Sequence, residues 1–248
     1  MRSASPPEQE VKATEAENVA RRARGERFGF ARRPTAKKFR LRNEVQSEQS
    51  RLYKQLTPAY EMFFPLLVRR RIWDTIGDLR LAEGSSVLEV GVGTGTSLLA
   101  YPTNINVIGI DLSTEMLALA QRKIDQEGWK HIHVQPGNAE QLEFPDASFD
   151  CVTSFHTVSV VARPDQMMRE IVRVLRPGGR LLIINHFRSP RPWLANMIDR
   201  ADPVTRHLGW RTDLAIDAII RSLPLQVDRC YKTSPLSLFT VIRATRLE

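Results

Sequence analysis

The sequence lacks the features that mark membrane-spanning and disulfide-stabilised proteins. It contains no run of 18 or more apolar residues, which excludes a transmembrane helix. The N-terminus also has no apolar core like that of a secretory signal, which favours a cytoplasmic protein. The two cysteines, Cys151 and Cys230, are too few for a disulfide framework and too far apart for a zinc site. We expect both thiols to be buried in strands, and no cluster of ligands suggests any metal.

Acidic residues are scarce in one region near the N-terminus. The whole chain carries a net charge of +8, yet residues 21–42 contain ten Lys or Arg and only one acid, Glu26, so this stretch alone carries +9. Such a block is either a solvated tail or an arm for a polyanionic surface, nucleic acid or acidic lipid, and charge alone does not separate these. Residues 1–45 also lack hydrophobic periodicity, which predicts a disordered or partly helical arm.

A helical pattern follows this arm. Between residues 51 and 81, aromatic and aliphatic side chains recur at steps of three and four, with a break near Pro65. We therefore expect amphipathic helices over residues 46–82. Their aromatic apolar face could dock on a membrane surface, or it could pack on the sheet as part of the core, and both could hold for different faces.

The rest of the chain alternates short apolar runs with amphipathic helices. This rhythm predicts parallel strands joined by right-handed crossovers, within a domain that spans residues 46–248. One helix should be capped by Ser113 and ended by Gly128, and another should begin at Pro164 and stop at residues 176–179. Residues 187–224, rich in proline and arginine, interrupt the rhythm as an insertion on the substrate side. The predicted strands are 86–90, 106–110, 131–135, 149–155, 180–186, 225–231 and 236–245.

The strongest functional signal is a glycine-rich loop after the first of these strands. Three glycines at alternate positions, residues 91, 93 and 95, should let the backbone turn tightly and approach a ligand before a helix begins. Twenty residues after Gly91, Asp111 ends the next strand, where a carboxylate can accept both ribose hydroxyls of a nucleoside. Glu89 precedes the loop, where an acid suits the ammonium group of a methionine moiety and would repel a pyrophosphate.

These residues resemble the motifs of class I S-adenosylmethionine-dependent methyltransferases. Residues 89–95 (E-V-G-V-G-T-G) resemble motif I, Asp111 matches the ribose-binding acid, and residues 176–179 match the turn before strand five. Residues 137–140 resemble the G-D-A-E segment that meets the adenine amino group, with Asn138 in place of Asp; an amide oxygen can still accept that bond.

The resemblance covers roughly residues 50–246 and implies an α/β fold with a Rossmann-like sheet, mostly parallel with an antiparallel last strand. It also implies S-adenosyl-L-methionine as the cofactor. The predicted cofactor site consists of Glu89, Gly91, Gly93, Gly95, Asp111, Leu112, Met116, Asn138, Ala139 and Ser154.

Within this family, three segments resemble bacterial phosphatidylethanolamine N-methyltransferases of the soluble, peripheral type. They are residues 158–161 with Pro164, residues 185–189 and residues 208–213. The resemblance implies successive methylation of phosphatidylethanolamine to phosphatidylcholine by a cytoplasmic enzyme that associates peripherally with an anionic membrane surface. The implied partners are a phospholipid substrate and that membrane, with no nucleic acid.

The residues expected to act on the substrate come from three regions. His156 and His186 lie at the carboxyl ends of strands four and five, where ligands gather in open α/β sheets, and either could accept the ammonium proton. Tyr53 is the third residue predicted to be catalytic, after the two histidines. Together with Tyr60, it is expected to close over the cofactor and present an aromatic face to the methylated ammonium. Arg211 is our first choice for the lipid phosphate, followed by Arg188 and Arg206.

Three other functions are also compatible with parts of the sequence. A quinone C-methyltransferase shares the sheet and the aromatic N-terminal segment, but it would methylate a ring carbon and need no phosphate-binding arginine. An RNA methyltransferase could use the basic arm, although no aromatic stacking motif accompanies its arginines. A non-catalytic membrane-binding protein could retain the fold alone, but the intact Glu89, Gly91, Gly93 and Asp111 argue against it.

Overall fold

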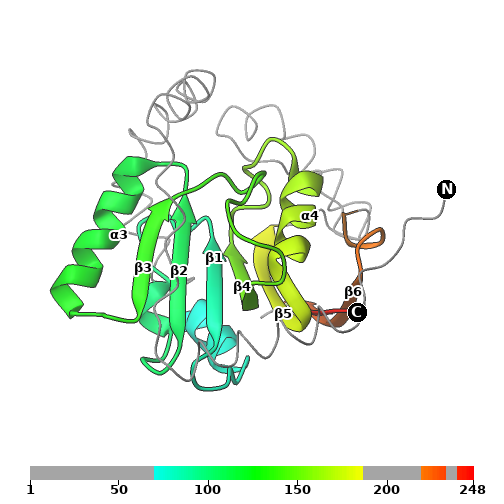
Figure 1. The fold of residues 1–248 in the computed structure, drawn as a ribbon, viewed down its shortest axis with the longest axis horizontal. Helices are drawn as coiled ribbons and strands as arrows, with labels where there is room; N and C mark the ends of the chain where they lie inside the picture. The colour runs from blue at the N-terminus through cyan, green and yellow to red at the C-terminus, as the bar shows by residue number, and fades with distance from the viewer. Residues whose placement is uncertain (1–69, 187–218, 233–238) are drawn as a thin grey trace, which may run out of the picture. The chain divides into compact units, whose positions relative to one another are not determined.

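The computed structural model describes residues 70–186, 219–232 and 239–248. These residues form one mixed sheet flanked by helices (Figure 1). The helices are residues 70–77, the single 3-10 turn η1 (Leu98–Ala100), α3 (Thr114–Glu127) and α4 (Pro164–Val174). The strands are β1 (Ser86–Val90), β2 (Asn106–Asp111), β3 (Ile132–Pro136), β4 (Phe149–Phe155), β5 (Leu175–His186), β6 (Leu225–Lys232) and β7 (Phe239–Arg246).

The strand order is β3-β2-β1-β4-β5-β7-β6. Each neighbouring pair among β1 to β5 is parallel, whereas β7 runs antiparallel to both β5 and β6. The expected fold class is therefore confirmed, including the antiparallel last strand. The chain moves outward from β1 to β3 and then returns to β4 on the other side of β1, so the carboxyl ends of β1 and β4 form the topological switch point, where ligands bind in open α/β sheets.

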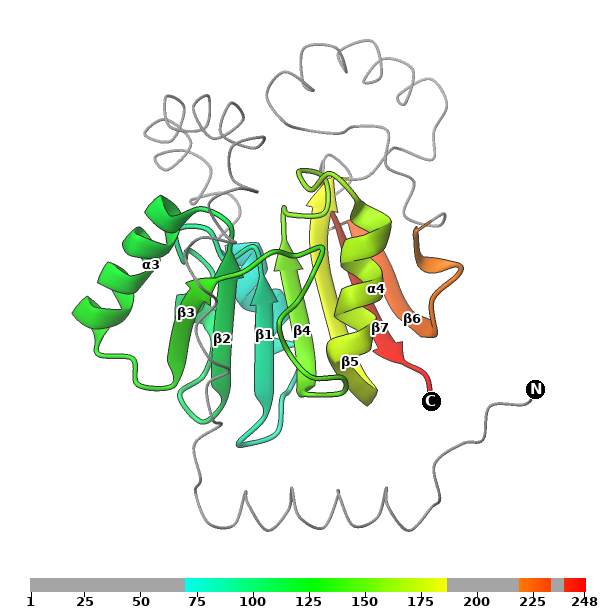
Figure 2. The ribbon, with the colours of Figure 1, turned by 45° about the horizontal axis from the view of Figure 1, so that its top comes forward.

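The two faces of the sheet are covered by different helices. Figure 2 shows α4 in front of the strands and residues 70–77, in cyan, behind them. Because side chains alternate along a strand, Leu88 and Val90 of β1 pack with α4, whereas Val87 and Glu89 face the other side. Buried side chains from three segments, 70–79, η1 and α3, line that second side. They are Ile72, Ile76, Leu79, Leu98, Leu117, Ala120 and Ile124.

The predicted ends of α3 are confirmed by their capping contacts. The Ser113 hydroxyl accepts a hydrogen bond from the Met116 amide at 3.2 Å, and Gly128 ends α3 in the left-handed conformation with φ of 67°. Helix α4 begins at Pro164 as expected, but it ends at Val174, before the predicted stop at residues 176–179, which belong to β5. No helix in the described ranges is long and apolar enough to span a bilayer.

The helix expected after the glycine loop is absent: η1 is the one helical element between β1 and β2, so this prediction was wrong. Tyr101, which follows η1, precedes Pro102 and is extended, with φ of −82° and ψ of 128°. A residue before proline is disfavoured in the helical region, and the segment turns directly toward β2.

The prediction of two buried thiols was also wrong for one cysteine. Cys151 is buried in β4, as expected, but Cys230 is exposed. Cys230 lies in β6, which is the edge strand of the sheet, and residues 226–230 of that strand are all exposed. Strand identity was therefore predicted correctly, whereas burial depended on the order in which the strands pair.

Candidate cofactor-binding and active site

The glycine-rich loop lies at the switch point and contacts the end of β2 and the loop after β4. The amides of Gly91 and Val92 donate to the Ile110 carbonyl at 2.8 and 2.9 Å, which joins the start of the loop to the end of β2. Gly91 has φ of 81°, and a Cβ there would stand 2.0 Å from the Thr157 Oγ1 atom. No side chain fits at this position, so the loops after β1 and after β4 meet here.

The other two glycines have different roles. A Cβ on Gly95 would approach Leu98 Cδ1 to 2.8 Å and Ala120 Cβ to 3.1 Å, so glycine lets the loop pack on α3. Gly93 has φ of 53°, but a Cβ there would meet only the Met116 sulfur, at 3.8 Å. The positive φ thus favours glycine at residue 93, and among the described residues only the Met116 sulfur comes near the space beside it. This open position between two acids is consistent with a nucleoside cofactor.

Asp111 holds the glycine loop in place. Its Oδ2 atom accepts the Gly93 amide at 2.9 Å, and its Oδ1 atom accepts the Ser113 amide at 2.9 Å. Burial raises the pKa of Asp111 above its ordinary value, and these backbone bonds act in the opposite direction. Each carboxylate oxygen keeps a second lone pair, which suits the predicted contacts with ribose hydroxyls.

Glu89 is buried beneath the loop with only 1% of its surface exposed. The Ser97 hydroxyl donates to Glu89 Oε1, and the Tyr101 hydroxyl donates to Oε2 at 2.7 Å. The same Tyr101 oxygen lies 2.7 Å from Thr153 Oγ1 on β4. Burial raises the pKa of Glu89 to about 7, although the bonds from Ser97 and Tyr101 lower it.

The segment after β3, expected to meet the adenine, is attached to both neighbouring elements. The Gly137 amide donates to the Asp111 carbonyl at 3.0 Å. Asn138 Oδ1 accepts the Glu140 amide at 2.9 Å, so one lone pair of that oxygen is already used within the loop. Glu140 in turn accepts both the backbone amide and the Nε of Arg163, each at 2.9 Å. The adenine contact of Asn138 remains a prediction.

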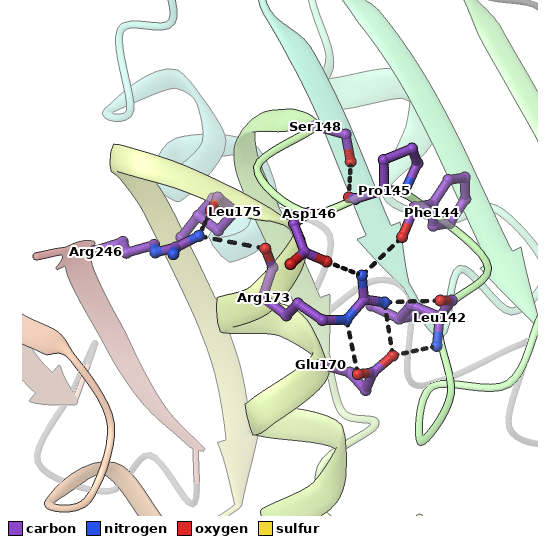
Figure 3. Close-up of polar contacts among 9 residues, drawn as sticks. All are labelled: Leu142, Phe144, Pro145, Asp146, Ser148, Glu170, Arg173, Leu175 and Arg246. Carbon is purple, nitrogen blue, oxygen red and sulfur yellow. Dashed lines mark hydrogen bonds and ion pairs between the residues drawn. The ribbon is translucent and has the colours of Figure 1, made fainter. Parts of the chain in front are cut away.

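A second group of contacts, centred on Arg173 of α4, holds the rest of this loop (Figure 3). The Arg173 guanidinium donates to the carbonyls of Leu142 and Phe144, each at 2.8 Å, and to Asp146 at 2.7 Å. It also pairs with Glu170, which accepts the Leu142 amide at 2.7 Å. Helix α4 thereby fixes the β3–β4 loop, and with it the segment next to the cofactor site.

The two predicted catalytic histidines occupy positions around Phe239, the first residue of β7. The His156 amide donates to the Ile184 carbonyl at 2.7 Å, and its ring meets the Phe239 ring edge-on with centroids 4.5 Å apart. His156 has φ of 59°, which is uncommon for a residue other than glycine. His186 ends β5 and pairs with Phe239 across the ladder. The structure therefore brings the two positions to the same edge of the sheet, next to the loop that contacts Gly91.

The remaining predicted residues divide into two groups. Ser154 is fully buried and its hydroxyl donates to the Val90 carbonyl at 3.1 Å, so it joins β4 to β1; a cofactor contact for it stays a prediction. Ala139 is buried beside the Asn138 turn, and Leu112 is half-buried between Asp111 and α3. The second group, outside the described residues, consists of Tyr53, Tyr60, Arg188, Arg206 and Arg211, together with the arm 1–45.

Sequence patterns did not reveal several residues that shape this site. Ser97, Tyr101 and Thr153 surround Glu89, and Thr157 contacts the glycine loop, yet none of them belongs to a local motif. Tyr101 is 52 residues from Thr153, so no short-range spacing could indicate their contact. The one usable signal is that Thr153 and Thr157 flank the end of β4, which the strand pattern placed next to β1.

The sheet order, the glycine loop at the switch point and the acid that ends β2 define the Rossmann-like class I methyltransferase fold. Residues 88–183 match the family model described as a methyltransferase domain. The crystal structure of the YcgJ protein from Bacillus subtilis has the same fold, with a TM-score of 0.62 over 71% of this chain and 98% of that one, at 20% identity.

Curated relatives extend this similarity beyond the fold. The phosphatidylethanolamine N-methyltransferase of Cereibacter sphaeroides is 40% identical over 166 residues, which cover 66% of this chain and 82% of that protein. The ubiquinone/menaquinone biosynthesis C-methyltransferase UbiE of Hahella chejuensis is 31% identical over 182 residues, covering 69% and 70%. The chain belongs to the class I S-adenosylmethionine-dependent methyltransferases, and S-adenosylmethionine is its methyl donor.

Proposed function

We propose that this enzyme transfers methyl groups to the amine of phosphatidylethanolamine, giving the monomethyl and dimethyl lipids and phosphatidylcholine at a membrane surface. The observation that carries this proposal is the 40% identity to the phosphatidylethanolamine N-methyltransferase of Cereibacter sphaeroides, over 82% of that protein. The aligned length of 166 residues exceeds the segment 88–183 that matches the general family, so the similarity includes parts outside the cofactor-binding half.

The acceptor amine must lose a proton before it can attack. A primary alkylamine has a pKa of about 10, so at neutral pH nearly all of it is protonated. S-adenosylmethionine supplies an electrophilic methyl group on a sulfonium, and the protein's task is to hold the amine in line and to take its proton. His156 is the described residue best placed for the second role, since it directly precedes Thr157, which touches the glycine loop.

Docking on the bilayer is part of this proposal. In the described part of residues 46–82, Ile72, Ile76 and Leu79 are buried in the core, so this stretch supports the alternative that its apolar face packs on the sheet. Trp73 on the same helix is 44% exposed, and Arg70 is also exposed. A tryptophan beside an arginine suits the interface between headgroups and acyl chains. We assign the docking role to this outward side and to residues 46–69, which lie outside the described ranges.

Methyl transfer from radiolabelled S-adenosylmethionine tests the acceptor directly. Vesicles of phosphatidylethanolamine, vesicles of phosphatidylcholine alone, a demethylated menaquinone and total RNA should be offered separately. We expect label in mono-, di- and trimethylated ethanolamine lipids and none in phosphatidylcholine vesicles, which have no free amine. Label in the quinone with the ethanolamine lipids clean would instead assign the enzyme to the activity named for the UbiE relative.

A matched pair of histidine variants tests the proton acceptor. His156→Gln should lower the rate of lipid methylation by about 100-fold, the ordinary contribution of a general base. His133→Gln, at an exposed position of β3, should keep the wild-type rate. Because the base acts only on the ammonium form, the rate of the His156 variant should recover as pH rises toward the pKa of the amine. Equal rates for both variants would remove His156 from the mechanism while leaving the choice of acceptor open.

A further inference from the structure

A cluster of buried hydroxyls surrounds the one fully buried carboxylate of the cofactor site. We define this hydroxyl cluster as Ser97, Tyr101 and Thr153, which are 4%, 4% and 0% exposed. Ser97 and Tyr101 each donate to a different oxygen of Glu89, and Tyr101 lies 2.7 Å from the Thr153 hydroxyl. The cluster connects three elements: the end of β1, the segment around η1, and β4.

The number of hydroxyl protons in the cluster determines the direction of its hydrogen bonds. The Tyr101 hydroxyl has one proton, which it donates to Glu89, so the contact with Thr153 requires Thr153 to be the donor there. The hydrogen bonds are therefore directed from Thr153 to Tyr101, from Tyr101 to Glu89, and from Ser97 to Glu89. Both carboxylate oxygens act as acceptors, which is the arrangement that suits an anion.

This anion has no cation beside it in the described part of the chain. None of the ion pairs among the described residues includes Glu89. The titratable groups that face it are Asp111 from β2, whose charge has the same sign, Tyr101, and the Cys151 thiol from β4, which lies beside Tyr101. A buried carboxylate that is held only by hydroxyls is costly, because two neutral donors do not replace its lost hydration.

The missing positive charge can come from the cofactor. The loop 91–97 begins two residues after Glu89 and ends at Ser97, so the carboxylate lies directly under the loop that borders the open position at Gly93. We propose that Ser97 and Tyr101, supported by Thr153, are positioning residues that hold Glu89 as the counter-charge for the ammonium group of S-adenosylmethionine. Deleting either hydroxyl should weaken cofactor binding indirectly, through its effect on Glu89.

The same arrangement links cofactor binding to a proton. Burial raises the pKa of Glu89 to about 7, so without cofactor near neutral pH a large share of the molecules hold a proton on this carboxyl. When the ammonium group binds, the O–H bond of Glu89 breaks, its proton passes to the buffer, and the carboxylate pairs with the ammonium. Below pH 7 the affinity should rise up to about tenfold per pH unit, and above pH 7 it should level off.

Calorimetric titration of the full chain with S-adenosylhomocysteine tests this without any methyl acceptor. Its outcome is therefore independent of the lipid assignment. Two buffers of different ionisation enthalpy report the number of protons released, at pH values below the range in which an α-amino group titrates, about 7.7–8.0. We expect release of close to one proton at about pH 6 and about half of one near pH 7. Binding of 5′-methylthioadenosine, which has no ammonium group, should release none.

Hydroxyl-deleting variants test the positioning role. Tyr101→Phe keeps the ring in place and removes a bond that lowers the pKa of Glu89, so its half-release point should move to higher pH and its affinity near pH 7 should fall about tenfold. Ser97→Ala should act in the same direction. Tyr231→Phe, a half-buried tyrosine in edge strand β6, is the matched control and should keep the wild-type profile. Glu89→Gln should bind without releasing a proton.

Any one of three results would overturn the proposal. The proposal is overturned if wild type binds S-adenosylhomocysteine with no proton release between about pH 6 and pH 7.5. It is also overturned if 5′-methylthioadenosine releases the same proton, or if both hydroxyl variants keep the wild-type half-release point. Thermal unfolding of each variant identifies one that has not folded, and the Ser97 variant then decides in place of the Tyr101 variant.

Discussion

Removing the buried charge of Glu89 should stabilise the folded chain at alkaline pH when no cofactor is bound. The side chain is 1% exposed, and burial raises its pKa from an ordinary value of 4.5 to about 7. The Glu89→Gln variant keeps the size and shape of the side chain but cannot ionise. It therefore represents the protonated form of Glu89 at every pH.

The sign and size of this change in stability follow from the difference in proton binding between the folded and unfolded states. Between about pH 4.5 and pH 7 the folded state binds more protons than the unfolded state, so the wild-type free energy of unfolding falls as pH rises through this window. The difference between the two pKa values corresponds to about 3 kcal/mol. The amide nitrogen of glutamine replaces one carboxylate oxygen and faces one hydroxyl donor, which must reorient at a cost of about 1 kcal/mol. Because that cost does not change with pH, we expect the variant to gain about 3 kcal/mol on the wild type from acid to alkaline pH, and to be about 2 kcal/mol more stable at alkaline pH.

Urea unfolding followed by circular dichroism at about pH 5 and pH 8 measures this gain. Glu143→Gln removes a carboxylate from an exposed position and serves as the charge control. The stability difference between Glu89→Gln and wild type should shift with pH, whereas the difference for the control should stay constant. If the Glu89 variant instead differs from wild type by the same amount at both pH values, Glu89 does not titrate in this window and the linkage argument is wrong.

Three further predictions concern packing, a polar cluster and thiol access. Gly91→Ala would place a Cβ 2.0 Å from a threonine oxygen, so it should lower the free energy of unfolding by about 3 kcal/mol and abolish binding of S-adenosylhomocysteine. Gly84→Ala, also at positive φ but with open space around it, should lower the free energy of unfolding by about 1 kcal/mol. Equal losses in the two variants would contradict the packing argument. Arg173→Met should destabilise by about 2 kcal/mol in urea unfolding, and Arg169→Met, an exposed pair on the same helix, by at most about 0.5 kcal/mol. A maleimide should label Cys230 alone in the folded protein and both cysteines after unfolding, since burial raises the pKa of the β4 thiol to about 12; rapid double labelling of the native chain would contradict this.

The agreement between sequence and structure is best where a signal is local. The hydroxyl of Ser113, the left-handed conformation available to Gly128 and the fixed φ of Pro164 each act within one helical turn. They therefore set both ends of α3 and the start of α4 regardless of the rest of the fold. The glycine loop and Asp111 were identified for the same reason: a strand, a turn and the next strand place them in order along the chain.

The expectations that failed depended on neighbours distant in sequence. The spacing of glycines predicted a helix after the loop, but Pro102 and the early return to β2 leave one 3-10 turn. The strand predicted at residues 225–231 is present, yet the exposure of Cys230 follows from the place of β6 at the edge of the sheet. Pairing order is a property of the assembled sheet, because each strand is covered or exposed according to which strands and helices lie beside it.

The sequence by itself determined the class of this protein, its cofactor and the positions of the acids that flank the loop. Only the tertiary structure decided that Glu89 would be enclosed by Ser97, Tyr101 and Thr153, and that α4 would hold the β3–β4 loop through Arg173. The physical reason is that a carboxylate's charge depends on the water and the donors around it. Ser97 and Tyr101 reach Glu89 from the segment around η1, and Thr153, which contacts Tyr101, joins them from β4 only when β1 and β4 pair.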